Sequence, residues 1–221
     1  MPLVGHILTA LAAYLLGSIP TGFLVGKARG ADIRTIGSGN IGATNVVRYF
    51  GMASGVLVLM ADVLKGWLAV AVMAHLFWSW FVPAQDLVSQ ERLEMIAGIA
   101  AVLGHNFTPW LGFKGGKGIA TSAGVLLALV PLSLLIIFAV WIVVFATSRY
   151  VSLASICASL ALPLATWLTG RTLTLIGVTS AMTGLAVFKH WSNIQRLLSG
   201  TENRFGSSHT NSQPAGSGSK S

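Results

Sequence analysis

The segment from Gly112 to Thr121 combines four glycines with two lysines between two long apolar runs. Glycines let the backbone turn tightly and bring its N–H groups close to an anion. Lys114 and Lys117 add positive charge, and a helix that begins near Ile119 points the positive end of its dipole at the same place. This combination predicts a phosphate-binding loop at the edge of a membrane.

Two more polar stretches carry groups that bind anions. Residues 37–48 are rich in small residues and in hydroxyl and amide donors, and they end in an arginine, which can hold a phosphate in bidentate fashion. Residues 189–203 place His190, Asn193 and Arg196 at intervals of three, on one face of a helix. Each stretch alone also has a structural explanation, as a turn before a helix or as a basic anchor at the membrane surface.

The composition is that of a polytopic helical membrane protein. Of the 221 residues, 54% are hydrophobic and only 9% are charged, with a mean hydropathy of +0.75, whereas a soluble domain carries about 25% charged residues. The net charge of +8 lies between apolar spans, which argues against nucleic acid as a partner. Cys157 is the only cysteine, which excludes an internal disulfide, and no Cys/His cluster for zinc is present.

Membrane spans, each needing about 20 residues, are predicted at residues 3–25, 54–76, 94–111, 119–147, 151–168 and 173–189. The long segment 119–147 is either one tilted helix or a helical pair broken near Pro131. If the segment is broken, the chain has seven spans, with the N-terminus outside and the C-terminus cytoplasmic. Eleven of the Lys and Arg residues in loops then lie on the cytoplasmic side and two on the other side, whereas an unbroken segment gives seven on one side and six on the other. Because cytoplasmic loops are enriched in Lys and Arg, we predict the broken form. Both halves are then expected to be short, which requires local thinning of the bilayer or burial within the bundle.

In this seven-span arrangement the three polar stretches all lie on the cytoplasmic face, which favours one shared anion site over three separate structural roles. Residues 1–206 are predicted to form a single membrane-embedded domain. The polar, low-complexity segment 207–221 is expected to be a disordered tail, or in part an appended segment.

Asp62 and Lys65 lie in the middle of a span, where a charge costs about 2.5–3.5 kcal/mol on insertion scales. We therefore expect a structural ion pair rather than a direct catalytic role.

With these motifs the chain resembles the bacterial acyl-phosphate:glycerol-3-phosphate acyltransferases. The resemblance rests on residues 37–48, 104–121, 150–155 and 190–202, in order and with fitting spacing. It implies a seven-span, all-α protein of the bacterial inner membrane with its active site on the cytoplasmic side. It also implies the reaction, in which acyl phosphate donates a fatty acyl group to the sn-1 hydroxyl of glycerol 3-phosphate. The products are lysophosphatidic acid, used in phospholipid synthesis, and inorganic phosphate.

The resemblance further implies the site residues. The positions of catalysis and substrate contact are Ser38, Arg48, Lys117, Ser155, His190 and Asn193, of which Ser38, Lys117, His190 and Asn193 are expected to be catalytic. The expected substrate-binding residues are Gly39, Asn40, Thr44 and Asn45 in the first loop, together with Arg48, Ser155 and the cations Lys114 and Arg196. We assign Lys117 and Arg48 to phosphate charge, and His190 with Asn193 to orientation of the acceptor. Whether His190 or a phosphate oxygen of the donor takes the hydroxyl proton stays open.

Acyl phosphate is already activated, so no cofactor or metal is expected. The expected partners are the two substrates and the lipid bilayer, and we expect a monomer. The alternative function is a membrane transporter or channel for a phosphorylated metabolite, which would also gather basic and glycine-rich loops. Transporters usually bind near the bilayer midplane and carry internal repeats, whereas here the polar residues cluster in loops and no repeat is visible. A structural or lipid-binding scaffold is the third possibility.

Overall fold

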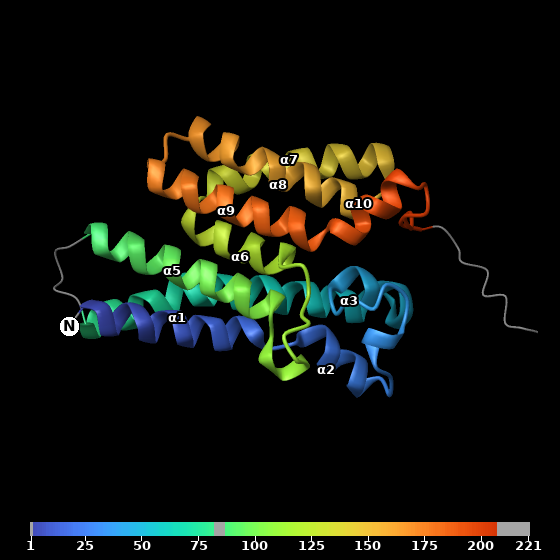
Figure 1. Cartoon of the computed structure of the whole chain (residues 1–221), viewed down its shortest axis with the longest axis horizontal. Helices are drawn as coiled ribbons and strands as arrows, with labels where there is room; N and C mark the ends of the chain where they lie inside the picture. Colours follow the sequence, from blue (N-terminus) through green and yellow to red (C-terminus); the bar gives the residue numbers. More distant parts are fainter. Residues whose placement is uncertain (1, 82–86, 207–221) are drawn as a thin grey trace, which may run out of the picture.

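The computed structural model describes residues 2–81 and 87–206, and the predicted tail 207–221 lies outside them. Within these ranges the chain is helical and contains no β-strand. The longer helices run side by side along one direction (Figure 1). The helices are α1 (Pro2–Ser18), α2 (Thr21–Ala28), α3 (Ala43–Leu68), α4 (His75–Phe81), α5 (Leu87–Asn106), α6 (Ile119–Leu129), α7 (Pro131–Ser148), α8 (Val151–Leu168), α9 (Leu173–Lys189) and α10 (Trp191–Leu198), with 3-10 turns at Ile33–Thr35 and Pro109–Leu111 and a π-helical segment, Ala69–Ala74, between α3 and α4.

The predicted break near Pro131 is confirmed. Helix α6 ends at Leu129, Val130 leaves the helical conformation (φ −143°, ψ 63°), and α7 begins at Pro131. Proline lacks a backbone N–H and is tolerated in the first turn of a helix, so it starts α7 rather than continuing α6. The expectation that both halves are short is wrong for α7, which has 18 residues. Only α6, with 11 residues, is short, and it packs inside the bundle against α3.

Other helix bounds depart from the predicted spans where local geometry overrides hydropathy. The first span divides into α1 and α2 at Ile19–Pro20. Helix α3 begins at Ala43, well before the apolar run, and bends at Gly51 (φ 83°, ψ 171°), a conformation that side chains other than glycine rarely adopt. Helix α5 ends at Asn106, so residues 107–111 belong to a loop. The predicted spans 151–168 and 173–189 coincide with α8 and α9.

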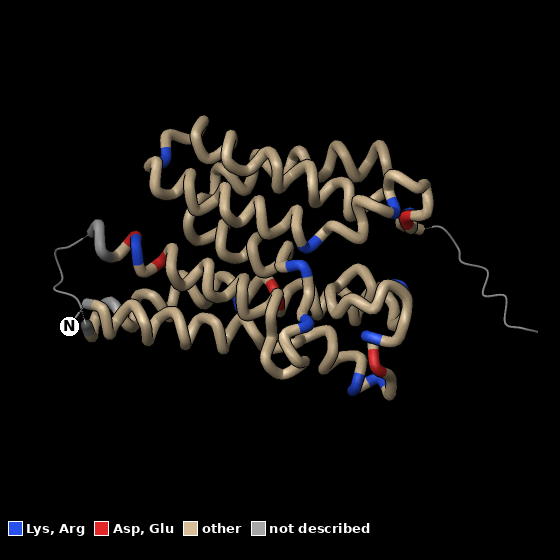
Figure 2. The backbone as a smooth tube through the Cα atoms, in the orientation of Figure 1, with Lys and Arg blue, Asp and Glu red and all other residues tan. Residues whose placement is uncertain are grey.

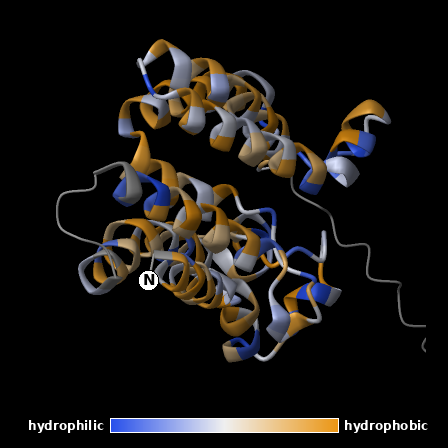
Figure 3. Ribbon diagram, turned by 60° about the vertical axis from the view of Figure 1, so that its left-hand side comes forward, coloured by the Kyte–Doolittle hydropathy of each residue, from blue (hydrophilic) through white to orange (hydrophobic). Residues whose placement is uncertain are grey.

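Four helical segments in the described ranges are long and apolar enough to cross a membrane. They are Leu3–Ala28, Ala43–Phe77, Pro131–Ser148 and Val151–Leu168, and the bent pair α9–α10 adds a fifth. Apolar residues run along the length of the helices, and hydrophilic ones concentrate at turns and ends (Figure 3). Large apolar side chains stay exposed on α1, α3, α7 and α8, as expected of a surface that faces lipid.

The charged residues are distributed unevenly along the bundle. Lys and Arg gather toward the end that carries α2, α10 and the loop before α6, and few lie at the end near the N-terminus (Figure 2). This asymmetry agrees with the uneven loop charge seen in the sequence, and it singles out one end of the bundle for anion binding.

Close contact between α3 and α6 depends on Gly124. A Cβ atom at this position would overlap the carbonyl oxygen of Val63. We expect Gly124→Ala to lower the melting temperature of the purified protein, because overpacking against a backbone that cannot yield costs about 1–3 kcal/mol. The matched control is Gly177→Ala on α9, where a Cβ meets open space; it should keep or raise the melting temperature. Equal melting of the two variants would contradict the close approach of α3 and α6.

Candidate active site

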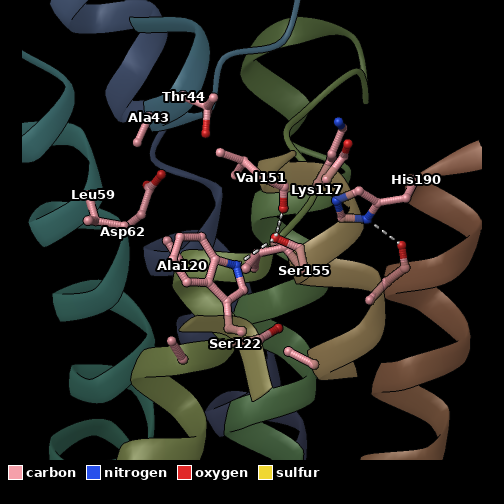
Figure 4. Close-up of a pocket in the computed structure, with 18 of the residues that line it drawn as sticks. Ala43, Thr44, Leu59, Asp62, Lys117, Ala120, Ser122, Val151, Ser155 and His190 are labelled. Atoms are coloured by element: carbon pink, nitrogen blue, oxygen red, sulfur yellow. Dashed lines mark hydrogen bonds between the residues drawn. The ribbon is translucent and has the colours of Figure 1, made fainter. Parts of the chain in front are cut away.

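A cavity of about 560 Å³ lies between α3, α6, α7, α8, α9 and α10 (Figure 4). Its lining is polar where the loops and helix ends meet and mostly apolar along the helices. The apolar walls come mainly from α3, α6, α7 and α8. They include Leu126, Leu134, Ile137, Phe138, Trp141 and Leu162. The polar side is formed by segments that are far apart in the sequence, so only the tertiary fold unites them.

The structure brings all but two of the site residues predicted from the sequence to this cavity. Gly39 and Lys114 are not among its lining residues. Gly39 occupies a turn with a positive φ of 68°, and the Lys114 side chain is exposed outside the cavity. The predicted residues that line the cavity are Ser38, Asn40, Thr44, Asn45, Arg48, Lys117, Ser155, His190, Asn193 and Arg196.

Asn45 holds the first loop in shape. Its side chain is buried, and its Nδ2 donates to the carbonyl oxygens of Ile36 and Asn40, both at 3.0 Å, while its Oδ1 accepts from the N–H of Ser38 at 3.3 Å. One amide side chain therefore satisfies several backbone groups of the loop at once. This arrangement leaves the side chains of Ser38 and Thr44 at the cavity.

The glycine-rich loop is built differently from the sequence-based expectation. The N–H groups of Gly115 and Gly116 do not face an anion site, because they donate to the carbonyl oxygens of Asn106 (3.2 Å) and His105 (3.1 Å) at the end of α5. These glycines allow close packing on α5. The part that faces the cavity is the N-terminus of α6, where Gly118 adopts φ 80° and begins the helix.

Three helix N-termini point their partial positive charge toward the cavity. The first turns of α3, α6 and α8 contribute Ala43 and Thr44, Ile119 and Ala120, and Val151 and Ser152 to its lining. The acidic lining residues are neutralised by cations. Asp62 pairs with Lys65 at 2.8 Å, which confirms the predicted ion pair, and Glu202 pairs with Arg196 at 2.7 Å. The cavity is therefore suited to bind anions.

A chain of hydrogen bonds joins the α6 side of the cavity to α10. The Nζ of Lys117 donates to Oδ1 of Asn193, whose Nδ2 donates to Oε1 of Glu202 at 2.7 Å. The same carboxylate accepts from Ser152 Oγ and from Arg196 Nε, both at 2.7 Å. Glu202 thus fixes three polar side chains of the site.

Glu202 was not among the predicted site residues. It is the only acidic residue after Glu94 in the sequence, and this isolation within a basic stretch was the available signal. Burial favours its protonated form, but the hydrogen bonds from Ser152, Arg196 and Asn193 prevail and hold the pKa of Glu202 below its usual value. The carboxylate is therefore ionised at neutral pH.

Trp141 is a second cavity residue that the sequence did not identify. Its Nε1 donates to Ser155 Oγ at 3.2 Å, while Ser155 Oγ donates to the carbonyl oxygen of Val151 at 2.8 Å. Trp141 lies inside an apolar run, where no sequence pattern separates it from lipid-facing aromatic residues. It stacks on Phe145, with ring centroids 4.9 Å apart, and so joins the polar side of the cavity to its apolar wall.

His190 is a hydrogen-bond acceptor toward the cavity. Its Nδ1 lies 2.7 Å from the carbonyl oxygen of Ala186; a carbonyl only accepts, so Nδ1 carries the proton and Nε2 is left with a free lone pair. Burial, followed by the charge of Lys117, lowers the pKa of His190 to about 4. The imidazole, which lies beside Lys117 in Figure 4, is neutral at pH 7.

Lys117 also titrates away from its ordinary range. Burial is the main reason that the pKa of Lys117 falls to about 8, and the positive charges of Arg196, Arg48 and Lys189 act in the same direction against the opposing effect of Glu202. The ammonium is therefore charged at neutral pH.

Among residues 2–81 and 87–206, no group of three or more His, Cys, Asp and Glu side chains is arranged to hold a metal ion.

Comparisons with known proteins show which family the chain belongs to. The family model described as glycerol-3-phosphate acyltransferase matches residues 7–200. A glycerol-3-phosphate acyltransferase from Geobacter sulfurreducens is 47% identical over 199 residues, which cover 90% of this chain and 96% of the relative. The corresponding protein from Geobacter metallireducens is 50% identical, with 90% and 97% covered.

Two solved structures share the fold. Both are crystal structures of PlsY, an integral membrane glycerol 3-phosphate acyltransferase, at 40% sequence identity. The glycerol 3-phosphate form has a TM-score of 0.80 and covers 91% of this chain and 96% of that one. The lysophosphatidic acid form has a TM-score of 0.78, with 91% and 95% covered. This chain is therefore a multi-pass membrane protein that belongs to the glycerol-3-phosphate acyltransferase family.

Proposed function

We propose that this protein transfers a fatty acyl group from acyl phosphate to the sn-1 hydroxyl of glycerol 3-phosphate, giving lysophosphatidic acid and inorganic phosphate. The observation that carries the proposal is that cationic polar residues and apolar residues line one and the same cavity. Both substrates carry an anionic phosphate group, but only acyl phosphate has a long apolar chain. A cavity lined by cationic and by apolar residues matches these two substrates.

The site residues divide into charge carriers and orienting groups. Arg48 and Lys117, with the helix N-termini, bind phosphate oxygens, because charge-assisted hydrogen bonds in a partly dry site are strong. Ser38 and Thr44 donate to the same phosphates. His190 orients the acceptor by accepting a hydrogen bond from glycerol 3-phosphate at Nε2. The enzyme gains most of its rate by holding the attacking hydroxyl about 3–3.5 Å from the acyl carbonyl carbon.

The chemical step needs little beyond this placement. The hydroxyl oxygen forms a bond to the acyl carbonyl carbon, the bond from that carbon to the phosphate oxygen breaks, and its electron pair leaves with the phosphate. A pKa of about 4 makes His190 a weak base. The hydroxyl proton therefore passes to an oxygen of the departing phosphate, which gains negative charge as the bond to carbon breaks and becomes the stronger base.

The arrangement in the membrane is part of the proposal. We propose seven crossings, by α1, α3, α5, α6, α7, α8 and α9, with the N-terminus outside and the C-terminus cytoplasmic. The polar side of the cavity then faces the cytoplasm in the bacterial inner membrane, which agrees with the gathering of Lys and Arg at that end (Figure 2). Residues 1–206 act as one membrane-embedded domain, and the protein works as a monomer.

The direct test of this function uses protein purified in detergent, mixed with acyl phosphate and glycerol 3-phosphate in the absence of vesicles. We expect lysophosphatidic acid and inorganic phosphate to appear in equal amounts. Phosphate release without acylated product, or product only when another acyl donor is supplied, would contradict the proposed donor. Binding of glycerol 3-phosphate without any turnover would favour the transporter alternative.

The pH dependence of the reaction reports on Lys117. The free enzyme holds Lys117 charged below about pH 8 and neutral above it, and kcat/KM reflects ionisations of the free enzyme. We therefore expect kcat/KM to be level up to about pH 7, to be roughly halved near pH 8 and to fall about tenfold per unit at higher pH. The measurement is a pH profile of initial rates, in which Lys117→Arg, whose side chain stays charged, should lack the alkaline fall. An identical fall in both proteins would assign it to another group.

A further inference from the structure

Beneath the glycine-rich loop lies a buried polar network, here called the brace, formed by Thr21, Asp62, Lys65 and His105. Lys65 Nζ donates to Asp62 Oδ1 at 2.8 Å, to the carbonyl oxygen of Ile19 at 2.9 Å and to His105 Nδ1 at 2.9 Å. Thr21 Oγ1 donates to the same Asp62 oxygen at 3.0 Å. The side chains of Asp62 and Lys65 are only 3% and 5% exposed.

All three protons of the Lys65 ammonium are used inside the brace, so this lysine is not free to bind a substrate phosphate. Its charge is compensated by Asp62, and the pair therefore adds little net charge to the cavity. The network joins three parts of the chain, namely the turn between α1 and α2, the C-terminal part of α3 and the end of α5. The brace thus fixes the position of the His105 ring.

The glycine-rich loop packs directly against His105. The N–H of Gly116 donates to the carbonyl oxygen of His105 at 3.1 Å, and a Cβ at Gly116 would collide with Nε2 of the ring. A Cβ at Gly115 would collide with the His105 carbonyl oxygen. Both the backbone and the side chain of His105 therefore determine where Gly116 lies, and Lys117 is the next residue.

We infer that the brace is a positioning device, in which Lys65 and Asp62 hold the His105 ring against Gly116 and thereby aim Lys117 across the cavity at Asn193. None of the four brace side chains is assigned to the chemistry. The inference rests on the proposed function, because it gives the brace its effect through the phosphate-binding role of Lys117. The sequence predicts a structural ion pair between Asp62 and Lys65, and the inference gives that pair a role in positioning a site residue.

The experiment uses His105→Asn. The asparagine Oδ1 takes the place of His105 Nδ1 as acceptor for Lys65, so the ion pair stays satisfied, but the half of the ring that touches Gly116 is lost. We expect kcat/KM to fall about tenfold or more, since small misplacements of a site group are costly. We also expect the alkaline fall in kcat/KM to move above pH 8, because a displaced Lys117 is less buried. Thr9→Val, which removes a buried hydroxyl on α1, is the control and should alter neither quantity.

A double-mutant cycle separates positioning from general destabilisation. In the Lys117→Ala background, His105→Asn should change kcat/KM by less than about twofold. An equal loss in both backgrounds, or an alkaline fall that stays in place, would overturn the inference and leave the proposed function standing. Wild-type kinetics in Lys117→Ala alone would overturn the role of Lys117 and the brace together.

Gly116→Ala approaches the same contact from the loop and keeps the inference testable if His105→Asn does not fold. Its methyl group pushes against His105 Nε2, so the loop must shift. We expect the same upward movement of the alkaline fall. A variant with unchanged kcat/KM and an unchanged pH profile would show that the loop position does not govern Lys117, and the inference would be wrong.

Discussion

Lys117→Ala is expected to reduce kcat/KM about 10²- to 10³-fold, the loss seen when one preorganised donor is removed from a site that stabilises developing charge. The change removes an ammonium that donates to Asn193 across the cavity. It also deprives the bound phosphate of one of its two assigned cationic partners, Lys117 and Arg48, in a partly dry environment, where electrostatic interactions are poorly screened. The measurement is steady-state kinetics with each substrate varied in turn.

The contrast for this variant is Lys114→Ala. Lys114 belongs to the same loop and carries the same charge, but its side chain is exposed outside the cavity, so its removal should have far less effect on kcat/KM. If both substitutions reduced kcat/KM equally, the loop would act through its net charge at the membrane surface. The cavity would then not be the phosphate site.

Glu202→Gln is expected to damage both activity and stability. The amide keeps the shape of the side chain but loses the charge that accepts from Ser152, Asn193 and Arg196. Each hydrogen bond to a buried charged group contributes about 1.5–3 kcal/mol, and the loss leaves the Arg196 guanidinium without its partner. We expect kcat to fall by at least about tenfold, together with a lower melting temperature.

The control for Glu202→Gln is Asp32→Asn. Asp32 also pairs with an arginine, Arg34, at 2.6 Å, but this pair lies at the surface, where solvent screens it and such pairs contribute little. Activity and melting temperature should be close to those of the wild type. A Glu202→Gln protein with normal kcat would show that Asn193 and Arg196 keep their positions without the carboxylate, which would remove Glu202 from the working site.

Much of the architecture was readable from the chain alone. Hydropathy located α8 and α9 at their observed bounds, and the uneven division of loop charges favoured a break at Pro131 that the structure contains. The bounds of α3 were not readable, because residues 43–50 are too polar to resemble a span, and because the bend at Gly51 that redirects them is a backbone property. Sequence patterns register hydropathy and charge well, and local conformation poorly.

The sequence by itself determined the class of the protein and the chemical character of its polar stretches, because both follow from composition and from residue types at short range. Only the tertiary structure decided which of these groups act together. Lys114 and Lys117 are indistinguishable by type, yet one is exposed and the other crosses to Asn193. Likewise, the glycine N–H groups expected to hold an anion are taken by α5 carbonyl oxygens. The physical reason is that contacts between residues far apart in the chain depend on packing, which no local pattern encodes.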